Sequence, residues 1–270
     1  MRASLAFITL ASTAFAGAPV AADKSDYDLF HPTPRAQMRE MSTDRPDQTE
    51  SPYTVDAGHW QVELDFLNVT LERNRTERSE TWNFAPINLK LGLTNRVDLQ
   101  MLFDGYTRER SGGITTRGWG DLTMRLKVNL WGNDGGSTAA AVMPFVKVPL
   151  HGQGEYEGGI ILPLAVELPG GWGMGVMTEV DWLADADGRG HHAEWLNSIT
   201  FSHDITERLG GYVEFVAVVS TERGAPWVGQ IDCGLTFAVT DNVQLDAGCN
   251  FGITRAAPDL QPFLGISLRF

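Results

Sequence analysis

Alternation of apolar and polar residues constrains the fold of this chain more than any other feature of the sequence. In the segment 120–132, GDLTMRLKVNLWG, alternate residues lie on opposite faces. The apolar face has Leu122, Met124, Leu126, Val128 and Leu130, and the polar face has Asp121, Thr123, Arg125, Lys127 and Asn129. A period of two is typical of β-strands whose two faces meet different surroundings. The pattern recurs in about twelve segments of membrane-spanning length: 60–71, 81–93, 97–103, 122–130, 139–148, 160–168, 172–182, 195–201, 213–219, 231–239, 243–251 and 262–270. The sequence therefore predicts an all-β fold.

The connections between these segments alternate in length. Tight turns are LTNR, WGNDGG, LPGG, DITER and TDN, and longer polar loops are ERNRTERSE, TRERSGGITTRG, HGQGEYEGG, ADADGRGHH, TERGAPW and TRAAPDL. Short turns at one rim and longer loops at the other are typical of outer-membrane barrels. With this topology all eight tryptophans fall near strand ends, as in the aromatic girdles of such barrels.

A secreted β-sandwich or a lipocalin-like barrel would also alternate. Charge separates the alternatives, because the polar faces carry enough charged groups for a water-filled lumen: Glu63, Asp65, Lys90, Asp98, Arg125, Lys127, Glu179, Asp181, Glu214, Asp232, Asp246 and Arg269. We therefore predict a transmembrane antiparallel β-barrel of about twelve strands, with short periplasmic turns, modest extracellular loops and both termini in the periplasm. Phe270, a terminal aromatic on an alternating strand, fits the signal that the barrel-assembly machinery of Gram-negative bacteria reads.

The N-terminus has the pattern of a secretory signal peptide: Arg2, then an apolar stretch, then small residues. Cleavage is expected after Ala22 rather than after Ala16, and no cysteine stands at either position to carry a lipid. The predicted organisation is a signal peptide at 1–22, an N-terminal periplasmic or plug segment at 23–56 and a transmembrane barrel at 57–270. Past residue 22 no apolar run reaches the length of a membrane-spanning helix.

Charge and cysteine content narrow the function classes. A formal net charge of −13 argues against nucleic acid as a partner. Two cysteines, Cys233 and Cys249, do not make a disulfide scaffold. The strand register places them opposite each other on the lipid face, where a bond would be geometrically strained.

The segment MSTDRPDQTESPYTVDAGHWQVELDF, 41–66, resembles the opening of a family of outer-membrane transporters named for a MetA pathway of phenol degradation. GWGDLTMRLK, FVKVPLHG, NVQLDAGCNFGIT and the final GISLRF are also similar to that family. The likeness extends over about 42–270. It implies a barrel with a transport role, whose cargo would be aromatic or hydrophobic if the family name reflects its substrates.

Two groups of residues are candidate functional positions. The first lies in STDRPDQTESP, where Asp44, Arg45, Asp47 and Glu50 could fold into the lumen as a plug; a periplasmic tether that caps the mouth is the alternative. The second comprises the lumen-facing charges of the wall: Glu179, Asp181, Glu214, Asp232, Asp246, Arg125 and Lys127. If the segment is a plug, Arg45 should meet one of these carboxylates. Opposed acidic and basic walls would favour small polar or zwitterionic cargo.

Other chemistry is weakly indicated. His191 and His192 with Asp185 and Asp187, and His151 with Glu155 and Glu157, are interpreted as solvated loops rather than metal sites, and no cofactor is implied. Ser198 and His203 are an odd number of residues apart, so on a strand they would face opposite sides and could not form a catalytic pair. No G-x-S-x-G element occurs. We therefore expect a channel for small molecules whose partners are outer-membrane lipid, the assembly machinery and its cargo. The alternatives are an outer-membrane enzyme of phospholipase type and a purely structural barrel.

Overall fold

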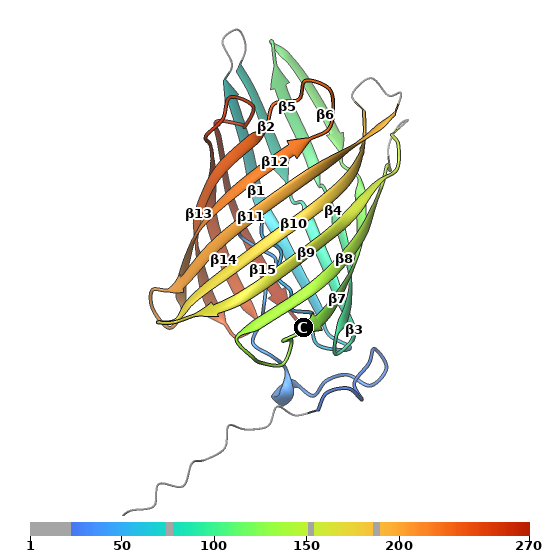
Figure 1. Ribbon diagram of the computed structural model, residues 1–270, viewed down its shortest axis with the longest axis vertical. Helices are drawn as coiled ribbons and strands as arrows, with labels where there is room; N and C mark the ends of the chain where they lie inside the picture. The colour runs from blue at the N-terminus through green and yellow to red at the C-terminus, as the bar shows by residue number, and fades with distance from the viewer. Residues whose placement is uncertain (1–22, 74–77, 151–153, 186–189) are drawn as a thin grey trace, which may run out of the picture.

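A computed structural model describes residues 23–73, 78–150, 154–185 and 190–270; the predicted signal peptide lies outside these residues. The strands form one antiparallel sheet whose last strand, β15, pairs with its first, β1, so the sheet closes into a barrel. Neighbouring strands pair in sequence order around most of the ring (Figure 1).

The strands follow one short 3-10 turn, η1 (Arg35–Gln37). They are β1 (Trp60–Arg73), β2 (Arg78–Phe84), β3 (Ile87–Thr94), β4 (Val97–Phe103), β5 (Tyr106–Ser111), β6 (Ile114–Trp119), β7 (Leu122–Trp131), β8 (Thr138–Val148), β9 (Glu157–Leu168), β10 (Trp172–Ala184), β11 (His191–Asp204), β12 (Leu209–Ser220), β13 (Val228–Thr240), β14 (Val243–Gly252) and β15 (Leu260–Arg269).

Three membrane strands are each interrupted once, so that fifteen segments make a twelve-stranded barrel. The breaks separate β2 from β3, β4 from β5 and β6 from β7, and Ala85 (φ 54°) and Gly105 (φ 73°) adopt left-handed backbone conformations at two of them. Continuous strand over 81–93 was therefore a wrong expectation, because left-handed φ values break the extended backbone.

Beyond the breaks, β2, β5 and β6 pair with one another and form what we call the blade. The blade rises at the top of the barrel in Figure 1. The predicted polar loop 107–118 is in fact most of the β5–β6 hairpin, and between Tyr106 and Trp119 its residues are mostly polar on both faces. Alternation of polarity does not mark a strand where both faces meet water.

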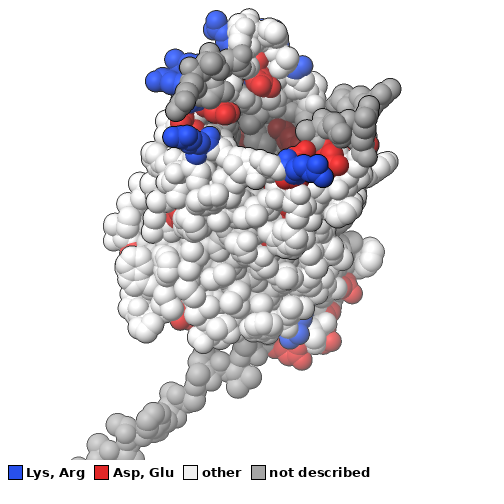
Figure 2. Space-filling view, turned by 45° about the horizontal axis from the view of Figure 1, so that its top comes forward, with Lys and Arg blue, Asp and Glu red and all other residues white. Residues whose placement is uncertain are grey.

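The barrel is apolar outside and polar inside. Phe215 is 41% exposed on the outer surface, whereas Lys127, on the inner surface, is 1% exposed. On the face seen in Figure 2, the wall is largely uncharged between its two ends, and charged side chains gather at the rims. This inside-out distribution is that of a barrel whose outer surface meets lipid.

Tryptophans lie at strand ends near both rims. Trp60, Trp131 and Trp172 are at the end with the short turns, and Trp182, Trp195 and Trp227 are toward the end with the longer loops. Trp82 and Trp119 lie at the foot of the blade. Within the described ranges, no helix has the length and apolar character needed to cross a membrane.

Candidate functional site: a segment inside the lumen

Residues 42–56, here called the inner segment, lie inside the barrel and precede β1. They reach the lumen from the short-turn end, where the C-terminus also lies (Figure 1). The segment contains no regular secondary structure. Its backbone polar groups therefore need partners from the wall.

Asp44 is held between two wall lysines. Its carboxylate oxygens lie 2.5 Å from Lys90 Nζ and 2.6 Å from Lys127 Nζ. Lys90 also pairs with Glu63, whose carboxylate accepts hydrogen bonds from the backbone N–H of Asp44 at 3.2 Å. Burial alone would raise the pKa of Asp44, but the charges of Lys127 and Lys90 outweigh it and hold the pKa well below its usual value.

Arg45 pairs with carboxylates on two other strands of the wall, β1 and β14. Its Nη2 atom lies 2.7 Å from Asp246 Oδ1 and 2.5 Å from Asp65 Oδ1, and its guanidinium packs over the Phe263 ring at 5.8 Å from the centroid. The expected contact between Arg45 and a lumen carboxylate is present.

Gln48 and Thr49 donate hydrogen bonds to carboxylates of the wall. Both backbone N–H groups donate to Glu214 at 2.8 Å. The Gln48 side-chain amide donates to Asp232 Oδ2 at 2.6 Å, and the Thr49 and Ser198 hydroxyl oxygens lie 2.6 Å apart. Glu214 and Asp232 are direct neighbours across β12 and β13.

Glu50 and Asp47 differ in their surroundings. Glu50 forms an ion pair with Arg125, and its backbone N–H lies 3.2 Å from Met177 Sδ. No basic residue pairs with Asp47 in the described part of the chain, and burial together with the nearby Glu214 carboxylate raises the pKa of Asp47.

The end of the inner segment is fixed at the short-turn rim. The backbone N–H of Val55 donates to Asp98 at 3.0 Å, and Asp56 lies 3.4 Å from Arg39 and 3.7 Å from Arg269. His59 then contacts the Phe270 carbonyl oxygen at 2.9 Å through Nδ1. These contacts join the segment to the first and last strands together.

The predicted wall residues fall into two groups. Asp246, Glu214, Asp232, Arg125 and Lys127 all contact the inner segment, as described above. Glu179 and Asp181 share the lumen face of β10, but among the described residues they make no ion pair with the inner segment.

Sequence reasoning omitted several contact residues from the site: Glu63, Asp65, Lys90, Asp98, Ser198 and His59. Strand parity already placed most of these side chains inward. Three glycines were also missed, because a β-carbon at Gly92, Gly175 or Gly265 would collide with Asp56, Thr49 or Arg45 respectively. A glycine on a lumen-facing strand position is the signal that another backbone or side chain approaches closely.

One side of the lumen is apolar. Met143, Ile161 and Met177 form a cluster on β8, β9 and β10, at most 1% exposed, with Phe145 and Leu196 packed against it. We call these five residues the apolar strip.

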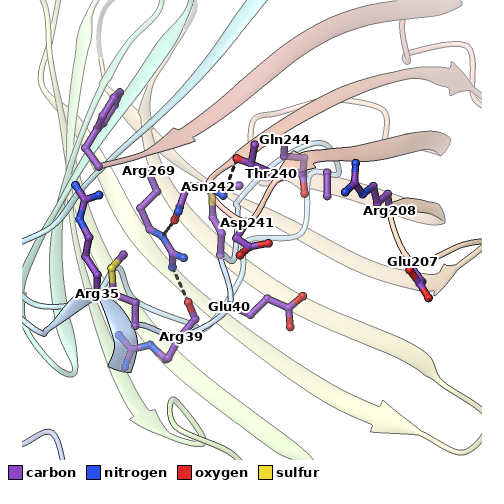
Figure 3. Close-up of a pocket in the computed structure, with 14 residues that line it drawn as sticks. Arg35, Arg39, Glu40, Glu207, Arg208, Thr240, Asp241, Asn242, Gln244 and Arg269 are labelled. Carbon is purple, nitrogen blue, oxygen red and sulfur yellow. Dashed lines mark hydrogen bonds between the residues drawn. The ribbon is translucent and has the colours of Figure 1, made fainter.

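Cavities lie on both sides of the inner segment. At the short-turn mouth a cavity of about 560 Å³ is lined by Arg35, Arg39, Arg208 and Arg269 with Glu40, Glu207 and Asp241. In Figure 3, Arg269 lies between Asn242 and the Arg39 carbonyl. A cavity of about 170 Å³ lies between Asp44, Glu50 and the wall near Asp104.

The two histidines at the loop rim, His191 and His192, contact different carboxylates. His191 lies 3.3 Å from Glu155, and His192 lies 2.9 Å from Asp185. Asp185, His192 and Glu222 have ligand atoms within 4.8 Å of one another and could hold a metal ion. Glu157 pairs with Lys147 at 3.4 Å, whereas His151 and Asp187 lie outside the described residues.

Ser198 and His203 are not brought together. Ser198 faces the inner segment, and His203 contacts the Gly170 carbonyl oxygen at 3.2 Å and the Trp172 ring at 4.8 Å. Cys233 and Cys249 face each other across β13 and β14 as expected, and both are free.

The closed twelve-stranded wall, its apolar belt and its polar interior define an outer-membrane β-barrel. The family model described as "Putative MetA-pathway of phenol degradation" matches residues 43–270, and the chain belongs to that family. No curated protein matches the chain.

Solved structures share this fold. An outer-membrane channel from Pseudomonas putida F1 is 14% identical, with a TM-score of 0.60, and the match covers 85% of this chain and 100% of that one. The NanC porin is 11% identical, with a TM-score of 0.51, over 76% of this chain and 98% of that one.

Proposed function

We propose that this chain is an outer-membrane channel for small molecules, and that the inner segment is its plug. The observation that carries the proposal is the set of ion pairs from consecutive segment residues to four different strands of the wall: Asp44 to Lys90 on β3 and Lys127 on β7, and Arg45 to Asp65 on β1 and Asp246 on β14. A tether that only capped the mouth would not need charges matched to buried charges on four strands of the wall.

The charge pattern also supports a plug that can leave. Buried ions are stable only when paired or hydrated. With the segment docked, its charges pair those of the wall; with the segment withdrawn, water can hydrate the same wall. A wall of apolar residues would have no stable open state of this kind.

The cargo we infer is a small aromatic molecule with a polar group. The family description refers to phenol degradation. In this chain the plug covers the apolar strip at Met177, and charged walls face it. A lumen with one apolar side and one polar side matches a molecule of that character better than it matches a sugar.

Catalysis and a purely structural role are less well supported. Ser198 contacts Thr49 rather than a histidine. The two solved structures described above are a channel and a porin, which favours passage over hydrolysis. A phospholipase assay on the purified protein provides the direct test of the enzyme alternative.

Single-channel recording in planar bilayers tests the plug. We expect low conductance for the mature chain and a large increase for Asp44→Asn with Arg45→Gln, and for deletion of residues 23–56. The matched control is Asp28→Asn with Arg35→Gln, which makes the same charge changes outside the inner segment. Equal conductance of wild type, double variant and deletion would contradict the proposal.

Cargo is tested in the same recordings with the double variant. We expect 4-hydroxybenzyl alcohol to block the open current more strongly than glucose, and Met143→Asn with Met177→Asn to remove the difference. Equal block by the two solutes would reject the aromatic cargo but leave the channel proposal standing.

A further inference from the structure

A row of aromatic rings crosses the foot of the blade on its outward face. Centroids are 6.2 Å apart for Trp82 and Phe84, 6.5 Å for Phe84 and Tyr106, and 5.4 Å for Tyr106 and Trp119. Aromatic rows of this kind lie at the boundary between the hydrocarbon and the headgroups of a membrane. The row therefore marks the depth at which the outer surface of the blade leaves the hydrocarbon.

Arginines occupy the outward face immediately beyond this row. Arg108 is the direct cross-strand neighbour of Trp82 on one side and of Arg117 on the other. Arg110 follows two residues later on the same face, about 7 Å further along the strand. Arg78 lies on the same face of β2, and all four side chains are exposed.

The charges of these arginines differ in their surroundings from the charges in the lumen. In the described part of the chain, Arg78, Arg108, Arg110 and Arg117 form no ion pair, whereas the lumen cations Arg45, Lys90, Lys127 and Arg125 are all paired. On the outward faces of β2, β5 and β6, Glu80 is the sole acid, and its carboxylate accepts a hydrogen bond from the Trp82 indole. Four like charges thus stand together on a chain whose net charge is −13.

We propose that this arginine face, Arg78, Arg108, Arg110 and Arg117, binds the phosphate groups of lipopolysaccharide in the outer leaflet. Guanidinium groups bind phosphate oxygens through paired, charge-assisted hydrogen bonds. The arginines lie where headgroups would be, and the aromatic row directly below offers an apolar surface to the acyl chains. A soluble anion would use the arginines but not the rings. The inference depends on the outer-membrane location and not on the plug.

The test measures binding of deep-rough lipopolysaccharide to the full mature protein in detergent, by native mass spectrometry. We expect Arg108→Gln, Arg110→Gln and Arg117→Gln together to weaken binding on the order of tenfold or more. The matched control, Arg35→Gln, Arg96→Gln and Arg208→Gln, makes the same charge change on exposed residues of the short-turn rim and should bind like wild type.

Two further arms identify the ligand. Dephosphorylated lipid A should bind wild type as weakly as lipopolysaccharide binds the triple variant, and excess inorganic phosphate should compete poorly. If the glutamine variant does not fold, the corresponding triple lysine variant keeps the charge and should bind with intermediate strength. Unchanged binding by a folded variant, equal loss in the control, or full competition by inorganic phosphate would overturn the proposal.

Discussion

Arg45 packs its guanidinium against the α-carbon of Gly265, in the space that a β-carbon on residue 265 would occupy. We therefore expect Gly265→Val to push Arg45 away from Asp246 and to increase channel conductance. Gly118→Val is the matched control, because a β-carbon there would meet no atom within 4 Å. Planar-bilayer recordings measure the conductance of both variants. Equal conductance of the two valine variants would show that Arg45 does not need this space.

Neutralising Asp44 should release the plug more strongly than any other single change. Asp44→Asn leaves Lys127 without its carboxylate, and breaking a buried ion pair costs about 3–5 kcal/mol. That energy corresponds to a shift of roughly a hundredfold to a few thousandfold in the equilibrium between docked and free plug. The fraction of time spent open in single-channel records measures this shift.

The effect of Asp44 should depend on pH in one direction. Because Lys127 and Lys90 lower the pKa of Asp44 below its usual 3.8, the carboxylate stabilises the docked plug above that value, and this stabilisation is lost as pH falls. The difference in open fraction between wild type and Asp44→Asn should stay constant from about pH 8 to about pH 5 and shrink below about pH 4. A difference that disappears near neutral pH would be inconsistent with the lysine contacts.

A disulfide between the plug and the wall should lock the channel. The hydroxyl oxygens of Thr49 and Ser198 are 2.6 Å apart, so cysteines at both positions can reach bonding distance with small adjustments. In a Cys233→Ser, Cys249→Ser background we expect Thr49→Cys with Ser198→Cys to give a silent channel that reductant opens to the level of either single cysteine variant. A locked protein that still conducts would place the permeation path beside the inner segment.

The acidic wall should set which ions pass once the plug is out. Neutralising Glu179, Asp181, Asp232 and Asp246 together in the 23–56 deletion should reduce cation preference, because a wall of one sign concentrates the opposite ion. Reversal potentials in a salt gradient measure it. Unchanged selectivity in the folded quadruple variant would assign selectivity to other residues.

The alternation predicted the barrel and the inward direction of most site residues, because one face of each strand meets lipid. It failed where both faces meet water: the β5–β6 hairpin read as a loop, and Ala85 and Gly105 gave no sign that they interrupt the wall. Periodicity of polarity reports on unlike surroundings, and beyond its aromatic row the blade has polar surroundings on both faces.

The inner segment was harder to predict than the barrel. Its composition indicated that it would supply countercharges to the wall. Because the alternation placed wall carboxylates inward, Arg45 was expected to meet one of them. The pairing of Asp44 with both Lys90 and Lys127 did not follow, because it depends on how an irregular backbone crosses the lumen. No local sequence pattern encodes such a path.

The same contacts have a consequence for the order of assembly. Arg45 meets Asp246, 201 residues later, and His59 meets Phe270, 211 residues later. The segment made first therefore finds its partners only after the last strands are in place. During insertion the incomplete barrel should therefore have an open lumen, and the inner segment would close the lumen only when the last strand completes the ring.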